Sequence, residues 1–218
     1  MPKPTFFNLP EEKRRAITEI AIDEFAECEY SEVSISRIVE KAGIAKGSFY
    51  QYFTDKQDLF FYLVDLSGQQ KLEMLQQSQP PDPKMGLFAY LKYLIRAGLE
   101  YQFAQPKLNQ VAYKAIYGTL PFRHESLQRM KDAAADYYRQ LVEMGIAHGE
   151  IKPDINRETA AFVMGAVFND FGNYYIRKIG GDPYQIVEQK FSEAEIQVLE
   201  ETLDEVIQIL KQGLGKTQ

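Results

Sequence analysis

The sequence predicts an all-α protein of about nine helices, in which a small N-terminal helix-turn-helix domain of three helices precedes a larger helical domain. Apolar residues recur at intervals of three and four along most of the chain, and this spacing places them on one face of a helix. No sustained alternation of apolar and polar residues indicates a β-strand. The helical segments are separated by glycine and proline, and the clearest break is QSQPPDP, from Gln77 to Pro83.

The composition is ordinary for a globular chain that buries a core. Of the 218 residues, 45% are apolar and 26% are charged, and the longest apolar run, 160–168, is much shorter than the roughly 20 residues of a membrane span. The N-terminal stretch MPKPTFFNLPEEKRR has charges where a secretion signal would have its apolar core. The single cysteine, Cys28, forms no intrachain disulfide and gives no metal-ligand spacing. We therefore expect a cytoplasmic protein with no membrane partner, metal or cofactor.

The charge of the chain is unevenly distributed. A net charge of −6 gives no global field that would draw the protein to a polyanion. Residues 33–56 have four basic and two acidic side chains and a local net charge of +2. The local charge of this segment favours contact with nucleic acid.

The first three expected helices have clear start or stop signals. Proline is tolerated at the first helical position, so Pro10 followed by two glutamates opens the first helix. Its apolar stripe consists of Ile17, Ile20, Ala21 and Phe25. Ser34 has the position of an N-cap for a short second helix that reaches about Ala42, and Gly43 ends that helix because glycine adopts the left-handed conformation without strain. The third helix is expected from about Lys46 to Tyr52.

Six further helices are expected after these. Thr54 has the position of a cap for the fourth helix, which would continue to about Gln77. The last helix begins near Ser192, where Glu195 completes a capping-box pattern. The expected ranges are about 54–77, 84–104, 106–118, 123–148, 156–178 and 193–212.

Three of the later helices have residues suited to close packing. Apolar residues step by three and four along the helices at 123–148 and 193–212, and the helix between them contains small residues that permit close backbone approach. Most such residues pack inside one chain. The functional alternative is that the last two helices also pair with their copies in a second subunit. The candidate dimer-interface residues are Ala161, Gly165, Leu199, Leu203, Val206 and Leu210.

The stretch KAGIAKGSFYQYFTDK, from Lys41 to Lys56, joins two short helices through a tight glycine turn, which is the geometry of a helix-turn-helix. The second helix of such a motif enters the major groove of DNA, while the first crosses the phosphate backbone. Small residues at Ala45, Gly47 and Ser48 keep the start of the second helix slim enough to approach base edges. The alternative is a three-helix core with chance spacing.

The aromatic residues of this stretch divide between two faces. Phe49 and Phe53 are four residues apart and are expected to bind the helix to the domain core. Tyr50 and Gln51 point elsewhere, toward DNA, and tyrosine suits this place because its ring packs while its hydroxyl bonds a phosphate oxygen. Lys56 would be unfavourable at the positive end of the next helix, so we expect a phosphate partner for it.

The segment from about Glu11 to Leu59 resembles the N-terminal domain of the TetR family of bacterial transcriptional regulators. The resemblance rests on AITEIAIDEFAE, then Tyr30, then SISRIVEKAGIAKGSFYQYFTDKQDL. The rest of the chain matches the family in being all helical and of suitable length. The resemblance implies a helix-turn-helix DNA-binding domain at residues 1–56 and a helical effector-binding and dimerisation domain at residues 57–218.

The resemblance also implies a function and a set of contacts. The function is a repressor that binds a palindromic double-stranded DNA operator as a homodimer and is released by a small apolar or amphipathic effector. Ser34 stands at the family's capping and phosphate-contacting position, Tyr50 at its near-universal tyrosine and Lys56 at its phosphate-binding lysine. The expected DNA-binding residues are Ser34, Ser36, Arg37, Lys46, Gly47, Ser48, Tyr50, Gln51, Tyr52 and Lys56.

Two positions depart from the family pattern. Glu29 stands where the family usually has glycine, so the end of the first helix is expected to be less tightly closed. Ala45 stands where serine often caps the recognition helix, and the missing side-chain cap costs about 1 kcal/mol.

The rival interpretation is an all-helical ligand-binding or enzymatic bundle that does not bind DNA. The two histidines, His124 and His148, lack the Glu-x-x-His spacing of di-iron bundles, and Cys28 has no histidine near it in sequence. No nucleophile elbow, Walker loop or dinucleotide fingerprint is present. We therefore expect no catalytic residues and no enzyme activity.

Aromatic residues are frequent in the larger domain. A sealed core suits many tyrosines poorly because each hydroxyl needs a partner, whereas a pocket with apolar walls and a few hydroxyls would hold a small apolar or amphipathic molecule. The candidate pocket residues are Tyr93, Tyr113, Tyr117, Tyr137, Phe168 and Phe171.

Overall fold

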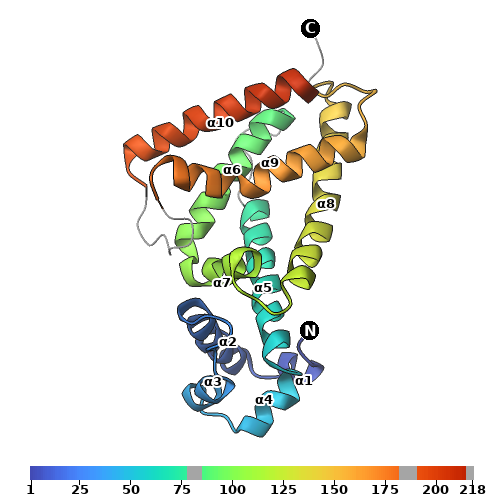
Figure 1. Ribbon diagram of the computed structural model, residues 1–218. Helices are drawn as coiled ribbons and strands as arrows, with labels where there is room; N and C mark the ends of the chain where they lie inside the picture. The colour runs from blue at the N-terminus through green and yellow to red at the C-terminus, as the bar shows by residue number, and fades with distance from the viewer. Residues whose placement is uncertain (78–84, 182–190, 215–218) are drawn as a thin grey trace. The chain divides into compact units, whose positions relative to one another are not determined.

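A computed structural model describes residues 1–77, 85–181 and 191–214, and within these ranges the chain has ten α-helices and no strand (Figure 1). None of these helices is long and apolar enough to cross a membrane. The all-α prediction is therefore confirmed. The helices are α1 (Pro4–Phe7), α2 (Glu11–Glu27), α3 (Ile35–Lys41), α4 (Lys46–Tyr52), α5 (Lys56–Gln77), α6 (Leu87–Ala104), α7 (Pro106–Tyr117), α8 (Arg123–Ala147), α9 (Arg157–Lys178) and α10 (Glu193–Leu214).

The chain divides by packing into two compact units. The N-terminal unit comprises Met1–Glu73 and Gln105–Leu127, and the C-terminal unit comprises Met74–Ala104 and Gln128–Gln218. The division passes through α5 and α8, and it assigns α7 to the same unit as α2, α3 and α4. The boundary expected at residue 56 concerns function and stays a prediction.

Nine of the ten helices correspond to expected segments, and α1 was not expected. A four-residue helix is too short to show an apolar period, so the sequence gives no signal for it. Its single buried residue, Phe6, is fully inaccessible to solvent and lies against the rings of Phe53 and Tyr62, with centroids 4.7 and 5.3 Å away. This contact makes the α1 segment part of the N-terminal core.

The turn between α3 and α4 forms as expected. The Ser34 hydroxyl accepts a hydrogen bond from the Arg37 amide at 3.3 Å, which confirms Ser34 as the N-cap of α3. Gly43 has a φ of 62°, a left-handed conformation that favours glycine, and the Ile44 amide donates to the Val39 carbonyl at 3.0 Å. The chain therefore reverses at Gly43 and enters α4.

The start of α5 differs in one detail from the expectation. The Asp55 side chain, not that of Thr54, caps the helix by accepting a hydrogen bond from the Asp58 amide at 2.8 Å. Asp58 in turn accepts from the Thr54 amide at 2.9 Å, so the two carboxylates bind backbone donors in both directions. The prediction of Thr54 as the cap is wrong because the aspartate that follows it takes that role.

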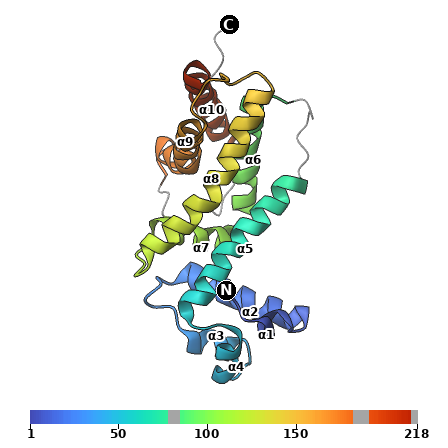
Figure 2. The ribbon, with the colours of Figure 1, turned by 90° about the vertical axis from the view of Figure 1, so that its right-hand side faces the viewer.

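The helix α7 packs on α2 inside the N-terminal unit, and the two lie side by side in both views (Figures 1 and 2). Leu108, Val111 and Ala115 are buried on α7. The loop after α7 contributes Phe122, whose ring meets the edge of the Tyr30 ring with centroids 4.9 Å apart. The core that supports α3 and α4 thus contains residues from a segment far along the chain.

The C-terminal unit is built around two apolar clusters. The larger joins α6, α8, α9 and α10, and the smaller joins α9 to the first half of α10. The predicted capping box of α10 is confirmed, since the Ser192 amide donates to Glu195 at 2.7 Å and the Glu195 amide donates to the Ser192 hydroxyl at 3.3 Å. Asn156 caps α9 by accepting from the Thr159 amide at 2.9 Å.

Candidate nucleic-acid interface

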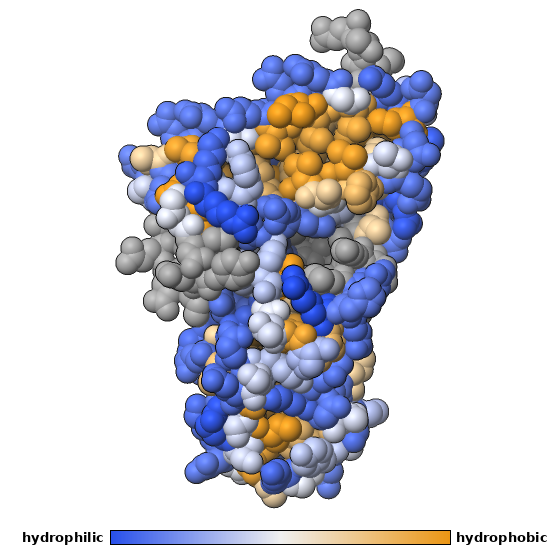
Figure 3. All heavy atoms as spheres, in the orientation of Figure 1, coloured by the Kyte–Doolittle hydropathy of each residue, from blue (hydrophilic) through white to orange (hydrophobic). Residues whose placement is uncertain are grey.

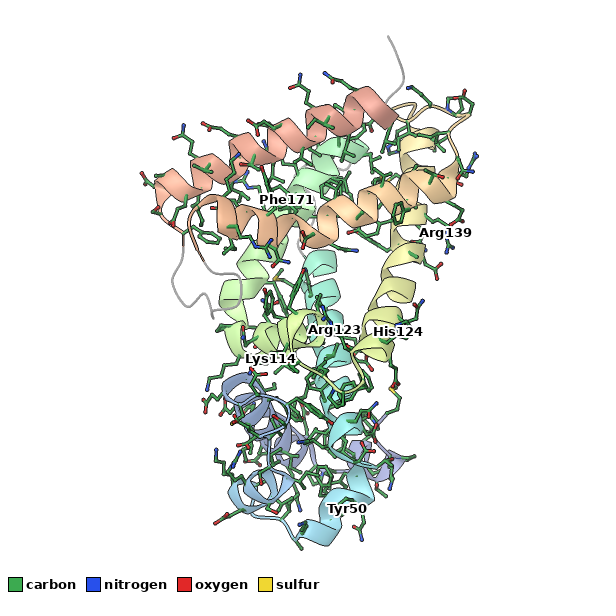
Figure 4. All side chains as sticks on the ribbon, viewed as in Figure 1. Tyr50, Lys114, Arg123, His124, Arg139 and Phe171 are labelled. Atoms are coloured by element: carbon green, nitrogen blue, oxygen red, sulfur yellow. The ribbon has the colours of Figure 1, made fainter. Side chains whose placement is uncertain are left out.

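The helix α4 has one buried face and one exposed face. Phe49 and Phe53 are 1% and 0% exposed, which confirms that they bind the helix to the core. Tyr50, labelled on α4 in Figure 4, is 45% exposed, and Gln51 is exposed beside it. An exposed aromatic ring next to a polar amide is the surface expected of a helix that reads a groove.

The N-terminal ends of α3 and α4 are brought together at the same surface. Ser36, Lys46 and Gly47 are exposed, while Ser34 and Ser48 are partly buried. The Lys46 ammonium lies 3.4 Å from the Ser36 hydroxyl, which links the two helices by a contact between predicted DNA-binding side chains. The Ala45 side chain forms no cap, as expected, so the first amides of α4 have no side-chain acceptor from that residue. The Ser48 amide instead donates to the Ala45 carbonyl at 2.9 Å.

Arg37 is tied to its own domain. Its Nε donates to the Glu24 carboxylate at 2.8 Å, and its Nη2 donates to the Glu32 carbonyl at 2.7 Å. Burial acts to raise the pKa of Glu24, but the hydrogen bonds from Arg37 and the Ser34 amide, and the charges of Arg37 and Lys41, bring that pKa below its ordinary value. Arg37 thus holds α3 to α2, and a DNA contact by its guanidinium stays a prediction.

Lys56 has protein partners that the sequence argument did not foresee. Its ammonium donates to the carbonyls of Tyr30 at 2.7 Å, Val33 at 3.1 Å and Ser31 at 3.5 Å, and it lies 4.6 Å from the centre of the Tyr30 ring. Burial lowers its pKa. The premise that Lys56 needs a phosphate to offset the α5 dipole is therefore wrong, because four turn groups already bind the charge.

Tyr52 occupies a core position. It is 7% exposed, and its ring centroid lies 6.1 Å from that of Phe6 in α1. The family resemblance places Tyr52 among the DNA-binding residues, because the family has an aromatic residue or a histidine at this position. A rotation of about 100° per residue carries Tyr52 around to the side covered by the unexpected α1.

The C-terminal end of α2 is closed by a lysine from α7. The Lys114 ammonium donates to the carbonyls of Ala26 and Cys28 at 2.8 Å each and to that of Phe25 at 3.2 Å (Figure 4). A cation is favourable at this end of a helix dipole, although burial lowers the pKa of Lys114. The expectation that Glu29 leaves this end loosely closed is wrong, since a distant lysine replaces the usual glycine. No local sequence signal identifies such a partner.

The candidate pocket residues lie in both units. Tyr113 and Tyr117 are on α7 in the N-terminal unit, with ring centroids 4.6 Å apart. Tyr137 and Phe168 border the larger cluster of the C-terminal unit, and Phe171 is buried in the smaller one. The remaining candidate, Tyr93, is on α6 with its ring near that of Tyr90. A pocket lined by these residues stays a prediction.

The dimer-interface residues expected from the sequence are mostly inside one subunit. Leu203 is fully buried, and Ala161, Gly165, Leu199 and Leu210 are also in the core, which leaves only Val206 partly exposed. The small Gly165 serves an internal contact, because a Cβ there would lie 3.1 Å from the Tyr138 ring. These five residues thus belong to the core of one chain, and their part in a dimer interface stays a prediction.

The exposed apolar residues of α9 and α10 are different ones. Phe162 is 72% exposed and Ile209 is 69% exposed. Figure 3 shows apolar side chains gathered over α9 and the C-terminal half of α10. Phe162 is the direct neighbour of the buried Ala161, so α9 is apolar on its exposed side as well as on its core side.

No arrangement for catalysis appears in the part of the chain that the structure describes. His124 and His148 are exposed, Cys28 is partly buried, and no group of three or more His, Cys, Asp or Glu side chains among the described residues could hold a metal ion.

Comparison with known families matches both parts of the chain. Residues 17–63 match a family described as bacterial regulatory proteins, tetR family. Residues 85–215 match one described as tetracyclin repressor-like, C-terminal domain. Helices α3 and α4 and the larger part of α2 fall in the first range, and α6 to α10 fall in the second.

Individual relatives agree with these matches. The HTH-type transcriptional repressor BepR of Brucella suis biovar 1 (strain 1330) is 26% identical over 171 residues, which are 76% of this chain and 81% of BepR. YhgD of Bacillus subtilis (strain 168), described as an uncharacterized HTH-type transcriptional regulator, is 27% identical over 159 residues, 70% of this chain and 78% of YhgD.

Solved structures share the fold. A TetR family transcriptional regulator from Chloroflexus aurantiacus J-10-FL is 43% identical over the whole of both chains, with a TM-score of 0.69. The regulator FadR of Bacillus subtilis, solved in complex with stearoyl-CoA, is 19% identical over 92% of this chain and 98% of its own, with a TM-score of 0.65.

Proposed function

This chain belongs to the TetR family of bacterial transcriptional regulators, and we propose that it represses transcription as a homodimer bound to a palindromic operator. It is a DNA-binding regulator and not an enzyme. The observation that carries the proposal is the exposed face of α4, where Tyr50 and Gln51 stand outward from a helix fixed by buried Phe49 and Phe53. A regulator of chromosomal genes works in the cytoplasm, where we place it.

Sequence selection tests the groove-reading role. Duplexes selected from a random pool, and DNA upstream of the protein's own gene, are the probes. Gln51→Ala is expected to change the preferred bases, whereas Tyr50→Phe is expected to weaken binding about equally on all duplexes because it removes a phosphate contact. Equal losses on every duplex for Gln51→Ala would refute its assigned role. Loose binding of every duplex that salt abolishes would overturn the proposal itself.

A second copy of the chain is the occupant we propose for the apolar surface at Phe162 and Ile209. Regulators of this family act as dimers, and two recognition helices enter successive major grooves when they are about 34–36 Å apart. Large exposed apolar side chains are the part of a surface that association buries most favourably. The two lie on the helices that the sequence assigned to dimerisation, although on a different face.

Charge introduced into this surface tests the dimer. Phe162→Glu and Ile209→Glu are expected to shift the protein to a monomer in sedimentation or light scattering, because a carboxylate buried without a partner costs several kcal/mol. Gln208→Glu, one position earlier on α10 and also exposed, is the matched control and is expected to remain dimeric. A full dimer in both apolar-to-Glu variants would exclude this surface.

The effector we propose is a small apolar or amphipathic molecule bound in the C-terminal unit. Tyr90, Tyr137 and Tyr138 of this unit pack against its larger apolar cluster, and the Tyr138 hydroxyl donates to the Asn169 side chain at 2.9 Å. Apolar rings with a few polar groups among them are typical of a pocket for an amphipathic molecule. FadR of Bacillus subtilis, which shares the fold, was solved with stearoyl-CoA, an amphipathic molecule. Release of a selected duplex by one of a set of fatty acids and acyl-CoA thioesters would support a repressor, and tighter DNA binding with the same molecule would contradict it.

A further inference from the structure

The last four carbonyls of the recognition helix α4 all have hydrogen-bond donors. A helix leaves its final four carbonyls without intrahelical partners, and those of α4 belong to residues 49–52. The Phe53 amide donates to the first of them at 2.8 Å. The other three bind the segment Lys3–Phe7: the Lys3 ammonium donates to Tyr50 at 2.7 Å, the Thr5 hydroxyl to Gln51, and the Lys3 amide to Tyr52 at 2.8 Å.

The helix α4 needs such external partners because little within it favours a helix. It has seven residues, which is far below the length at which an isolated helix persists in water. Its N-cap residue, Ala45, supplies no side-chain acceptor, and Gly47 lies in its first turn. Glycine within a helix costs more conformational entropy than any other residue. Stabilising contacts at the C-terminal end therefore weigh heavily in its conformation.

The segment that supplies these donors is itself anchored in the core. Phe6 is fully buried, and Pro2 is buried just before the segment. Pro4 occupies the first turn of α1, where its fixed φ suits the helix. Thr5 and Lys3 are thus held by their neighbours, whether or not DNA is present. The segment precedes residue 17, where the match to the tetR family begins.

We propose that the Lys3–Phe7 segment is a C-terminal clamp for the recognition helix, with Thr5 and Lys3 as positioning residues for DNA reading. The two side-chain donors bind the carbonyls of Tyr50 and Gln51, the residues whose side chains stand outward for DNA. Loss of either donor lets the last turn of α4 fray, and the side chains that read the groove lose a fixed direction. The consequence of the clamp for DNA reading rests on the proposed function, but its effect on the stability of α4 can be measured without DNA.

Thr5 offers a test without a change of charge. Thr5→Val removes the hydroxyl at nearly constant shape, and Thr5→Ser retains it. Thr5 is exposed, so neither change disturbs the core. Thr5→Val is expected to speed amide hydrogen exchange in peptides covering residues 46–53 by about threefold to tenfold, with exchange in α2 unchanged, because one hydrogen bond is lost. Thr5→Ser is expected to match the unmodified protein.

Affinity for a selected duplex is the second measurement on the same variants. Thr5→Val is expected to weaken binding of that duplex by about threefold to tenfold, with a smaller effect on random DNA, and Thr5→Ser is expected to restore it. Unchanged exchange in residues 46–53 for Thr5→Val would overturn the clamp. If Thr5→Val speeds exchange but the unmodified protein binds no duplex specifically, the clamp stands and the proposed function is refuted.

Lys3 needs one further control because its charge could bind a phosphate directly. Lys3→Met keeps the backbone amide that binds Tyr52 and removes the ammonium that binds Tyr50. If Lys3 acts by positioning α4, Lys3→Met is expected to weaken specific DNA binding without changing its dependence on salt. It is also expected to speed amide exchange in residues 46–53. Lys13→Met, an exposed lysine of α2, is the matched charge control. A salt slope lower by about one, with unchanged exchange, would make Lys3 a phosphate contact and overturn its positioning role.

Discussion

The two units of the molecule use their positive charges in different ways. In the N-terminal unit, Lys114 binds three backbone carbonyls at the C-terminal end of α2, and Lys56 binds three in the turn that follows. In the C-terminal unit, Lys92 and Arg96 of α6 pair with carboxylates of α10. A carbonyl accepts a hydrogen bond without neutralising the cation, so the contacts of these two lysines depend on hydrogen-bond geometry. The ion pairs between α6 and α10 depend mainly on charge.

The difference matters for how each unit can respond to its surroundings. An ammonium shielded by three carbonyls is little affected by salt, and it fixes the backbone that carries it. An exposed ion pair is screened by salt, and it contributes little to stability. The unit that reads DNA is thus fixed by salt-resistant contacts, although DNA binding itself depends strongly on salt.

The largest effect is expected from Lys114→Met. The substitution keeps the aliphatic stem and leaves three carbonyls at the end of α2 without their donor, which is expected to lower the free energy of unfolding by about 2–3 kcal/mol. Denaturant unfolding measures it. Lys107→Met, also on α7, removes exposed pairs with Asp23 and Glu27 at 2.8 and 3.1 Å and is expected to cost less than about 1 kcal/mol. Equal losses for the two variants would mean that a lysine bound by carbonyls is worth no more than one in exposed ion pairs.

The positions of the helices could be predicted because the sequence signals for helix starts and ends are local. The cap at Ser34, the left-handed turn at Gly43 and the capping box at Ser192 each involve residues within a few positions of one another. The two faces of α4 followed from the spacing of Phe49 and Phe53. Each of these features depends only on residues close together in the chain, so it can be predicted from the local sequence.

The rest of the candidate site could not be predicted because its partners are distant in sequence. Lys114 binds carbonyls 86 to 89 residues away, and a lysine on an amphipathic helix usually faces solvent. The division of α9 into a core face and an exposed face could not be predicted for another reason. The helix α9 is apolar on two faces, so periodicity could not decide whether Ala161 or its neighbour Phe162 faces the core.

An intermediate effect with a defined pH dependence is expected from Glu24. The folded pKa of this buried carboxylate lies below its ordinary value, so its stabilisation is complete above the unfolded pKa and is lost as pH falls through the folded pKa. Glu24→Gln is expected to cost about 1–3 kcal/mol at pH 7 and to flatten the loss of stability on acidification. Glu27→Gln, on the same helix and 60% exposed, is the control and should keep the acid sensitivity. If the Glu24→Gln variant lost stability on acidification as steeply as the unmodified protein, Glu24 would not be the source of the acid sensitivity.

The smallest effect is expected from Asp204→Asn in the C-terminal unit. The Asp204 carboxylate lies 2.8 Å from the Lys92 ammonium and is 66% exposed, and Glu200 already pairs with the same lysine at 2.9 Å. Because the pair is solvated and one partner remains, the variant is expected to lose about 0.5 kcal/mol or less of unfolding free energy at low salt and nothing measurable at 1 M salt. Parallel denaturant titrations at the two salt concentrations measure the difference. A loss as large as that of Lys114→Met, or one that persists at high salt, would mean that α6 and α10 are also fixed by a shielded contact, and the distinction between the units would then rest on DNA binding alone.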